Sequence, residues 1–156
     1  MVQIPPAVRA QLEANNFWQF ATTNADGSPA ATPVWASVEG DTVLVNTAVG
    51  RVKERNVRRD PRVALAMVDR ENPYAWIELR GRVVEFIDGE QADRSIDGLA
   101  QKYLGLARYA TAKPGEQRIL LRIEPTAIHM NTEAGEDPEK LRAKLDAEDR
   151  TRLAPN

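Results

Sequence analysis

Short β-strand patterns separated by tight turns fill the first third of the chain, and this succession constrains the fold more than any other feature. Residues 17–23 are rich in aromatic and β-branched side chains, which favour strands. The Asp-Gly pair that follows accepts the positive φ of a tight hairpin, so residues 30–38 return as a second strand. A turn at residues 39–41 leads to a third strand at residues 42–47. Because tight turns join antiparallel neighbours, we expect an antiparallel meander rather than a βαβ unit.

The middle of the chain predicts a short helix and two further strands. Residues 51–59 lack strand alternation and suit a helix, which the next Asp-Pro pair ends because the residue before a proline avoids the α region. Residues 63–68 are a continuous apolar run and predict a strand buried on both faces. Residues 75–87 predict a long fifth strand, in which Gly81 marks a bend or bulge.

The last third predicts a helix laid on the sheet, a sixth strand at residues 118–130 and a charged terminal helix. Asp88-Gly89 begins the first of these helices and Asp137-Pro138 the second. The expected inward residues are Ile96, Leu99, Ala100, Tyr103 and Leu104 on the first helix, and Leu141 and Leu145 on the second. Six short antiparallel strands with few helices are typical of a mainly β fold, a small barrel with Greek-key connections.

A cluster of basic residues interrupts an otherwise acidic chain. The whole protein has a formal net charge of −2, whereas residues 51–62 hold six basic side chains and only two acidic ones, Glu54 and Asp60. The basic residues are Arg51, Lys53, Arg55, Arg58, Arg59 and Arg62. The cluster follows a strand and Gly50 and begins a helix, where free N–H groups and the helix dipole attract anions. This pattern favours a phosphate-bearing ligand, although a solvated helix face would have the same composition.

Composition excludes several classes of protein. The 156 residues include no cysteine, which excludes disulfide scaffolds, thiolate catalysis, iron–sulfur ligation and cysteine-based zinc sites. A single histidine excludes histidine-rich metal sites, and we assign no metal. The net negative charge argues against nucleic-acid binding. The longest apolar run is too short to cross a membrane and the first residues lack the apolar stretch of a secretory signal, so we expect a soluble, cytoplasmic protein.

Four sequence segments together resemble the flavin and deazaflavin split-barrel family. They are ATTNADGSPAATPVW, VLVNTAVGRVKERNVRRDPRVALAMV, LRGRVVEF and DGLAQKYLG. This is the fold of pyridoxamine 5′-phosphate oxidase-like proteins, and the resemblance is closest to the branch of deazaflavin (coenzyme F420)-dependent reductases. The most specific element is R-x-K-x-x-N followed by RRDPRV. The resemblance implies a six-stranded split barrel over residues 1–132, with residues 133–156 as a charged C-terminal helix and tail outside it. It also implies a homodimer with two cofactor sites at the subunit interface.

The resemblance also assigns the residues that hold the cofactor. It places the cofactor phosphate at the third strand and the basic helix, on Thr47, Arg51, Lys53 and Asn56. It places the flat ring against the second strand, on Thr32, Pro33 and Val34, with Tyr74 or Trp76 of the partner subunit closing the site. The chain departs from pyridoxamine 5′-phosphate oxidase itself, which ends with a substrate-binding Arg and Trp, because the final tryptophan here is Trp76. A vitamin B6 oxidase is therefore not expected.

The function that follows is hydride transfer from reduced F420 to a small conjugated acceptor, such as an enone, a quinone or a tetrapyrrole-like molecule. FMN is the alternative cofactor, and a protein that binds a flavin, a deazaflavin or haem without turnover is a second alternative. Because the cofactor supplies the chemistry, the enzyme needs no catalytic triad, and the catalytic residue stays unassigned. His129, Tyr74, Tyr103 and Tyr109 are candidate proton donors, of which the tyrosine at 103 is better explained by packing.

Overall fold

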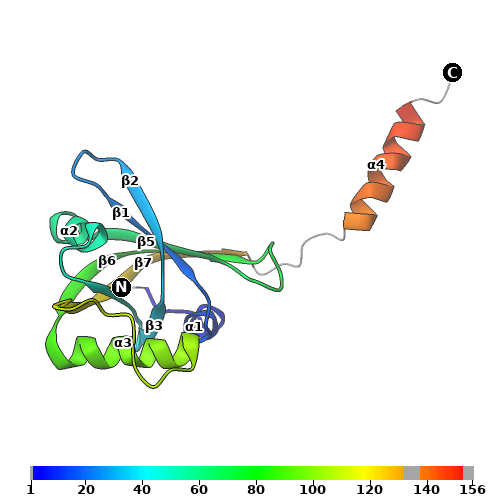
Figure 1. Ribbon diagram of the computed structural model, residues 1–156. Helices are drawn as coiled ribbons and strands as arrows, with labels where there is room; N and C mark the ends of the chain where they lie inside the picture. Colours follow the sequence, from blue (N-terminus) through cyan, green and yellow to red (C-terminus); the bar gives the residue numbers. More distant parts are fainter. Residues whose placement is uncertain (1, 132–137, 153–156) are drawn as a thin grey trace.

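The computed structural model describes residues 2–131 and 138–152, and its central feature is one curled antiparallel sheet (Figure 1). The sheet has seven strands in the order β2-β1-β5-β6-β7-β4-β3. The strands are β1 (Trp18–Thr23), β2 (Pro29–Val34), β3 (Ala36–Glu39), β4 (Thr42–Ala48), β5 (Arg62–Val68), β6 (Trp76–Ile87) and β7 (Arg118–Asn131). The helices are α1 (Pro6–Glu13), α2 (Val52–Arg59), α3 (Gly89–Leu104) and α4 (Pro138–Arg152).

The predicted second strand at residues 30–38 is two strands, which corrects the expected count of six. Its first part, β2, pairs with β1, whereas its second part, β3, pairs with β4 at the opposite end of the strand order. Only Trp35 separates the two parts. One continuous stretch of chain therefore joins the two edges of the sheet, which closes the sheet on itself as a split barrel. The strand breaks at Trp35 because the chain changes its pairing partner there from β1 to β4.

Two glycines fulfil the roles that the sequence predicts. Gly27 has a φ of 84° in the turn between β1 and β2, a conformation that favours glycine. Gly81 lies at a shift of register between β6 and β7, so the predicted bulge is confirmed. A Cβ atom at Gly81 would lie 2.6 Å from the carbonyl oxygen of Glu124, so no larger residue fits without moving the backbone of β7.

The barrel interior is filled by apolar side chains from the strands and from two helices. Val8 and Leu12 of α1 and Val57 of α2 join the same buried cluster as Trp18 and Phe20 of β1. The prediction that residues 63–68 are buried on both faces is wrong, because burial alternates along β5. The alanines of this strand point to the outer face, and their small apolar side chains hide that alternation in the sequence.

Helix α3 covers the outer face of β4 and β7, where Ala92 packs with Leu44 and Leu120. Its predicted inward stripe is confirmed at Ile96, Leu99 and Ala100, whereas the side chain of Leu104 is 54% exposed, because it lies in the last turn of the helix.

Helix α4 confirms the predicted C-terminal helix, although Asp137, the expected first residue, lies outside the described residues. The expected inward position of Leu145 is wrong, because α4 lies apart from the barrel in Figure 1 and this side chain is 61% exposed. Within the described ranges, none of the helices combines the length and apolar character that a membrane crossing requires.

Candidate functional site

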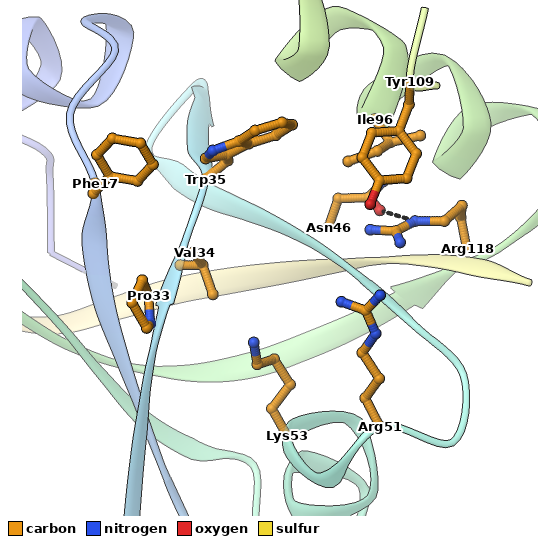
Figure 2. A pocket seen from close by; sticks show the side chains of 10 residues that line it. All are labelled: Phe17, Pro33, Val34, Trp35, Asn46, Arg51, Lys53, Ile96, Tyr109 and Arg118. Carbon is orange, nitrogen blue, oxygen red and sulfur yellow. Dashed lines mark hydrogen bonds between the residues drawn. The ribbon is translucent and has the colours of Figure 1, made fainter. Parts of the chain in front are cut away.

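A cavity of about 180 Å³ opens where β2, β4, α2, α3 and the start of β7 meet (Figure 2). One side is apolar and aromatic and another is strongly basic, and Figure 2 shows Pro33 across the cavity from Arg118. The lining residues are Phe17, Pro33, Val34, Trp35, Asn46, Arg51, Lys53, Ile96, Tyr109 and Arg118. A concave space with one flat apolar wall and a few convergent polar groups is typical of a small-molecule site.

The basic side of the cavity is the N-terminus of α2. Gly50, with a φ of 84°, turns the chain from β4 into the helix, and its N–H donates to the buried carboxylate of Glu54 at 3.0 Å. Arg51 is the N-cap residue and makes no side-chain cap, so the first turn of α2 presents backbone N–H groups that have no partner inside the helix. These donors and the helix dipole favour an anion beside Arg51 and Lys53.

Lys53 is the ammonium group that this anion would meet. Its Nζ atom has no hydrogen-bond or ion-pair partner in the part of the chain that the structure describes, although the residue is half-buried. Burial, followed by the charges of Arg51 and Arg118, lowers the pKa of Lys53 below its usual value. A half-buried lysine beside two other cations lacks an anion that bonds its ammonium group, and a bound phosphate would supply that anion.

Arg118 lies on the side of Arg51, across the cavity from Pro33, and two hydrogen bonds hold its side chain. Its Nε donates to Asn46 Oδ1 at 2.8 Å and its Nη1 donates to Glu116 Oε1 at 2.6 Å. The other oxygen of Glu116 accepts from Arg51 Nη2 at 3.2 Å, so one carboxylate joins two of the cations. Burial alone would raise the pKa of Glu116, but the hydrogen bond from Arg118 and the charges of both arginines bring it below the ordinary value.

The aromatic wall depends on the strand break between β2 and β3. Trp35 stacks on Tyr103 of α3, with ring centroids 5.1 Å apart and planes 9° apart. The Tyr103 hydroxyl donates to the carbonyl of Asn16 at 2.6 Å, and accepts from the N–H of Ala36 at 3.3 Å. Tyr109 meets Trp35 edge-on, with centroids 6.3 Å apart. The indole is thereby fixed as one flat face of the cavity.

The cavity brings together four of the eight residues that the resemblance assigns to the cofactor. Pro33, Val34, Arg51 and Lys53 line it, whereas Thr32 is exposed on β2 outside the lining.

Thr47 also lies outside the lining of the cavity. It is buried on β4, and its Oγ1 has no hydrogen-bond partner among the described residues. Thr47 is therefore buried near the cavity without lining it.

Asn56 faces away from the cavity and ties α2 to the hairpin of β1 and β2. Its Nδ2 donates to Thr22 Oγ1 at 3.0 Å and to Asn24 Oδ1 at 2.9 Å. Its Oδ1 accepts from Arg59 Nη2 at 3.1 Å. These contacts give Asn56 a structural role in holding the basic helix in place.

Trp76 contributes to a separate apolar surface. It lines a shallow hollow with Phe17, Val68 and Met67 at one end of β1, β5 and β6. The side chains of Trp76, Val68 and Phe17 are all exposed, and Phe17 also lines the candidate site. The apolar surface is therefore continuous with the mouth of the cavity.

Six of the ten lining residues were not assigned to the cofactor site from the sequence, and the polar ones among them are Asn46, Tyr109 and Arg118. They come from β4, from the loop after α3 and from the start of β7, and only the closed sheet brings them together. Arg118 carries one weak signal in the sequence, a charged residue directly before the apolar run at residues 119–121. Among the residues that the structure describes, no three histidine or acidic side chains are arranged to hold a metal ion.

Comparisons with known proteins agree with this geometry. The family described as pyridoxamine 5′-phosphate oxidase matches residues 4–132. A solved structure named F420 reductase is 26% identical, covers 81% of this chain and 98% of its own, and has a TM-score of 0.70. A putative pyridoxamine 5′-phosphate oxidase from Listeria innocua is 19% identical, covers 81% of this chain and 97% of its own, and has a TM-score of 0.62. No curated protein sequence matches the chain.

Proposed function

The chain belongs to the pyridoxamine 5′-phosphate oxidase family, and from this premise we propose that it is an oxidoreductase that uses reduced coenzyme F420 to reduce a small conjugated molecule. The acceptor class is an enone, a quinone or a tetrapyrrole-like compound. The deazaflavin supplies the hydride when it is bound. The protein residues hold the phosphate, orient the ring and exclude water.

The observation that carries this proposal is the unpartnered Lys53 beside the first turn of α2, across the cavity from a flat apolar wall. A phosphate placed there would accept hydrogen bonds from backbone N–H groups and from Lys53 and Arg51. Thr47 and Asn56 would support the same corner from outside the cavity lining, Thr47 as a buried residue near the end of β4 and Asn56 by fixing the helix. The donors present therefore fit a cofactor that bears a phosphate.

The ring of the cofactor would lie on the apolar wall. Pro33 and Val34 end β2 at the edge of the cavity, and Trp35 follows them as a fixed flat surface. Thr32 precedes them on the exposed side of the same strand, where it would meet the rim of the ring or the partner subunit. Since the phosphate corner and this wall line the same cavity, a ligand with a tricyclic ring and a phosphate would span both.

F420 is favoured over FMN by the likeness to the F420 reductase, which extends over 98% of that structure. FMN stays the alternative cofactor, because it also combines a tricyclic ring with a phosphate and would use the same residues. A protein that binds its cofactor without turnover is the second alternative. For haem, the single histidine, His129, is exposed on β7 and does not line the cavity.

The site is proposed to be completed in a homodimer. The exposed surface formed by Phe17, Val68 and Trp76 is apolar and begins at the mouth of the cavity. A second copy of the chain that covers this surface would bury the three side chains and close the open side of the cofactor site. Trp76 would then lie against the bound ligand of one subunit or the other.

The proposal is tested by titrating the purified protein with F420 and with FMN, and by following the oxidation of the reduced cofactor with a panel of enones and quinones. A colourless protein that binds F420 at micromolar concentration and oxidises it with an acceptor supports the proposal. A yellow protein that retains FMN through purification would favour the flavin alternative. Binding without oxidation by any acceptor would favour the role without turnover.

A further inference from the structure

We infer that Tyr109 is the proton donor of the proposed reaction, an inference that rests on the hydride transfer proposed above. Reduction of a conjugated acceptor needs a proton as well as a hydride, and four residues of the sequence are candidates to supply it. The structure separates them by position.

Tyr109 is the candidate that faces the cavity. It lies in the loop between α3 and β7, and the side chain of Asp97 accepts a hydrogen bond from its backbone N–H at 2.8 Å, which fixes the loop at this residue. Its phenolic Oη has no hydrogen-bond partner in the described part of the chain, although the residue is partly buried. A phenol that is held in a cavity with an uncommitted O–H is poised to donate to a ligand.

The other candidates lie elsewhere or are already engaged. The Tyr103 hydroxyl donates to the carbonyl of Asn16. Tyr74 is exposed and does not line the cavity. His129 is exposed on β7, where it pairs across the sheet with Glu78 of β6.

The remaining proton-bearing side chains of the lining are cations. Guanidinium groups do not release protons in proteins, which excludes Arg51 and Arg118. Lys53 faces the corner assigned to the phosphate, where its positive charge is needed. Among the ten lining residues, Tyr109 is therefore the acid that can give up a proton without dismantling the anion site.

A fixed cation lies beside the Tyr109 ring. The guanidinium carbon of Arg118 lies 5.2 Å from the centroid of the Tyr109 ring. Asn46 and Glu116 hold this guanidinium in place, so its charge is preorganised rather than recruited during the reaction. Arg118 thus acts on the proposed reaction only through Tyr109, so we describe it as a positioning residue.

In Figure 2 the phenol of Tyr109 lies across the cavity from the proposed ring wall at Pro33 and Val34, and we place the acceptor between them. When the β carbon of an enone receives a hydride from the reduced deazaflavin, the electrons of the C=C bond move toward the carbonyl oxygen. The Oη–H bond of Tyr109 breaks as an O–H bond forms on that oxygen. The enol then tautomerises to the saturated ketone, and the phenolate recovers its proton from water.

The test compares Tyr109→Phe with the wild-type protein and with His129→Gln, which removes the rival proton donor. The phenylalanine keeps the ring contacts with Trp35 and Arg118 and removes only the hydroxyl. With cyclohex-2-en-1-one as the acceptor, we expect kcat to fall about 10²- to 10⁴-fold in Tyr109→Phe, with the Kd for F420 unchanged. We expect His129→Gln to keep the wild-type rate.

A second readout needs no turnover. With oxidised F420 bound, 4-nitrophenolate mimics the developing oxyanion, and its absorbance reports binding. We expect its Kd to rise about 10- to 100-fold in Tyr109→Phe, because a hydrogen bond to a charged oxygen is lost. Hydride transfer and nitrophenolate binding that match the wild type in Tyr109→Phe would overturn this inference alone. A wild-type protein that binds neither F420 nor FMN would overturn the proposed function and this inference with it.

Discussion

Trp35 and Tyr103 lie in parallel stacking contact, with their rings 5.1 Å apart, at the point where the chain passes from one edge of the sheet to the other. This contact joins the closure of the barrel to the wall of the candidate site. It connects α3, which covers β4 and β7 from outside, with the break between β2 and β3. The residue that the fold needs as a strand break is therefore also the residue that shapes the cavity.

Replacing Tyr103 with phenylalanine should destabilise the protein by about 1–2 kcal/mol while leaving the ring stack in place. The hydroxyl bonds both the carbonyl of Asn16 and the N–H of Ala36, and its loss leaves these groups without this partner. Urea unfolding measures the change. Tyr74→Phe is the matched control. The side chain of Tyr74 is exposed, so loss of its hydroxyl should shift stability by less than about 0.5 kcal/mol. Equal effects of the two substitutions would contradict the structural role of the Tyr103 hydroxyl.

Asn56→Ala should lower stability by about 2–3 kcal/mol and leave cofactor affinity within about threefold of the wild type. Asn56 is buried and its side chain bonds Thr22, Asn24 and Arg59, so the substitution removes a hydrogen-bonded link between α2 and the β1–β2 hairpin. Thermal unfolding and F420 titration on the same sample separate the two effects. A variant that folds normally but loses F420 affinity would place Asn56 at the phosphate instead.

Lys102 makes stability depend on pH. Its Nζ donates to the carbonyls of Leu12 and Ala36, and burial lowers its pKa from 10.5 to about 8, against a smaller raising effect of Glu13. Between these two values the unfolded chain binds more protons than the folded one, so the contribution of this group to stability rises with pH.

We therefore expect the stability of the wild type relative to Lys102→Met to increase between pH 8 and pH 10.5. The increase should be about 2 kcal/mol, which is less than about 1.4 kcal/mol per pH unit because solvent screens this half-buried group. Below pH 8 the difference should be constant, because the lysine is charged in both states. Urea unfolding of both proteins across this range measures it. A stability difference that does not change with pH would show that the burial of Lys102 does not perturb its ionisation.

Val68→Glu should convert the proposed homodimer into monomers. Val68 lies beside Trp76 and Phe17 on the exposed apolar surface, and a carboxylate there would have to be buried by the partner subunit. Val84→Glu is the matched control, since this valine is similarly exposed on β6 outside that surface. Light scattering should give about twice 17.3 kDa for the wild type and the control, and the monomer mass for Val68→Glu. A monomeric wild type would refute the proposed dimer.

The elements of the fold could be predicted from local sequence patterns, whereas the closure of the barrel could not. The Asp-Gly turn, the bulge at Gly81 and the stripe of α3 are signalled within a few residues each. The break at Trp35 depends on pairing with two strands at opposite ends of the sheet, which no local pattern encodes. Likewise, Ala64 and Ala66 lie on the face of β5 that is not fully buried. Because both are apolar, the sequence shows no alternation of apolar and polar residues along this strand.

The basic corner of the site could also be predicted locally, because Arg51 and Lys53 are neighbours in one helical turn. Tyr109 and Arg118 are more than fifty residues further along the chain, and they reach the cavity only through α3 and β7. The sequence motif that assigns Arg51 and Lys53 to the phosphate also includes Asn56. The side chain of Asn56 instead lies on the face of α2 that meets the β1–β2 hairpin.

The most direct test of the account is the affinity for F420 of Lys53→Met, measured by fluorescence titration against the wild type and against Lys113→Met. Lys113 lies in the exposed loop before β7, outside the cavity, and the same chemical change there controls for the loss of one charge. The account predicts a Kd at least tenfold higher for Lys53→Met, with Lys113→Met unchanged. Micromolar F420 binding that persists after both Lys53 and Arg51 are replaced by methionine would contradict it.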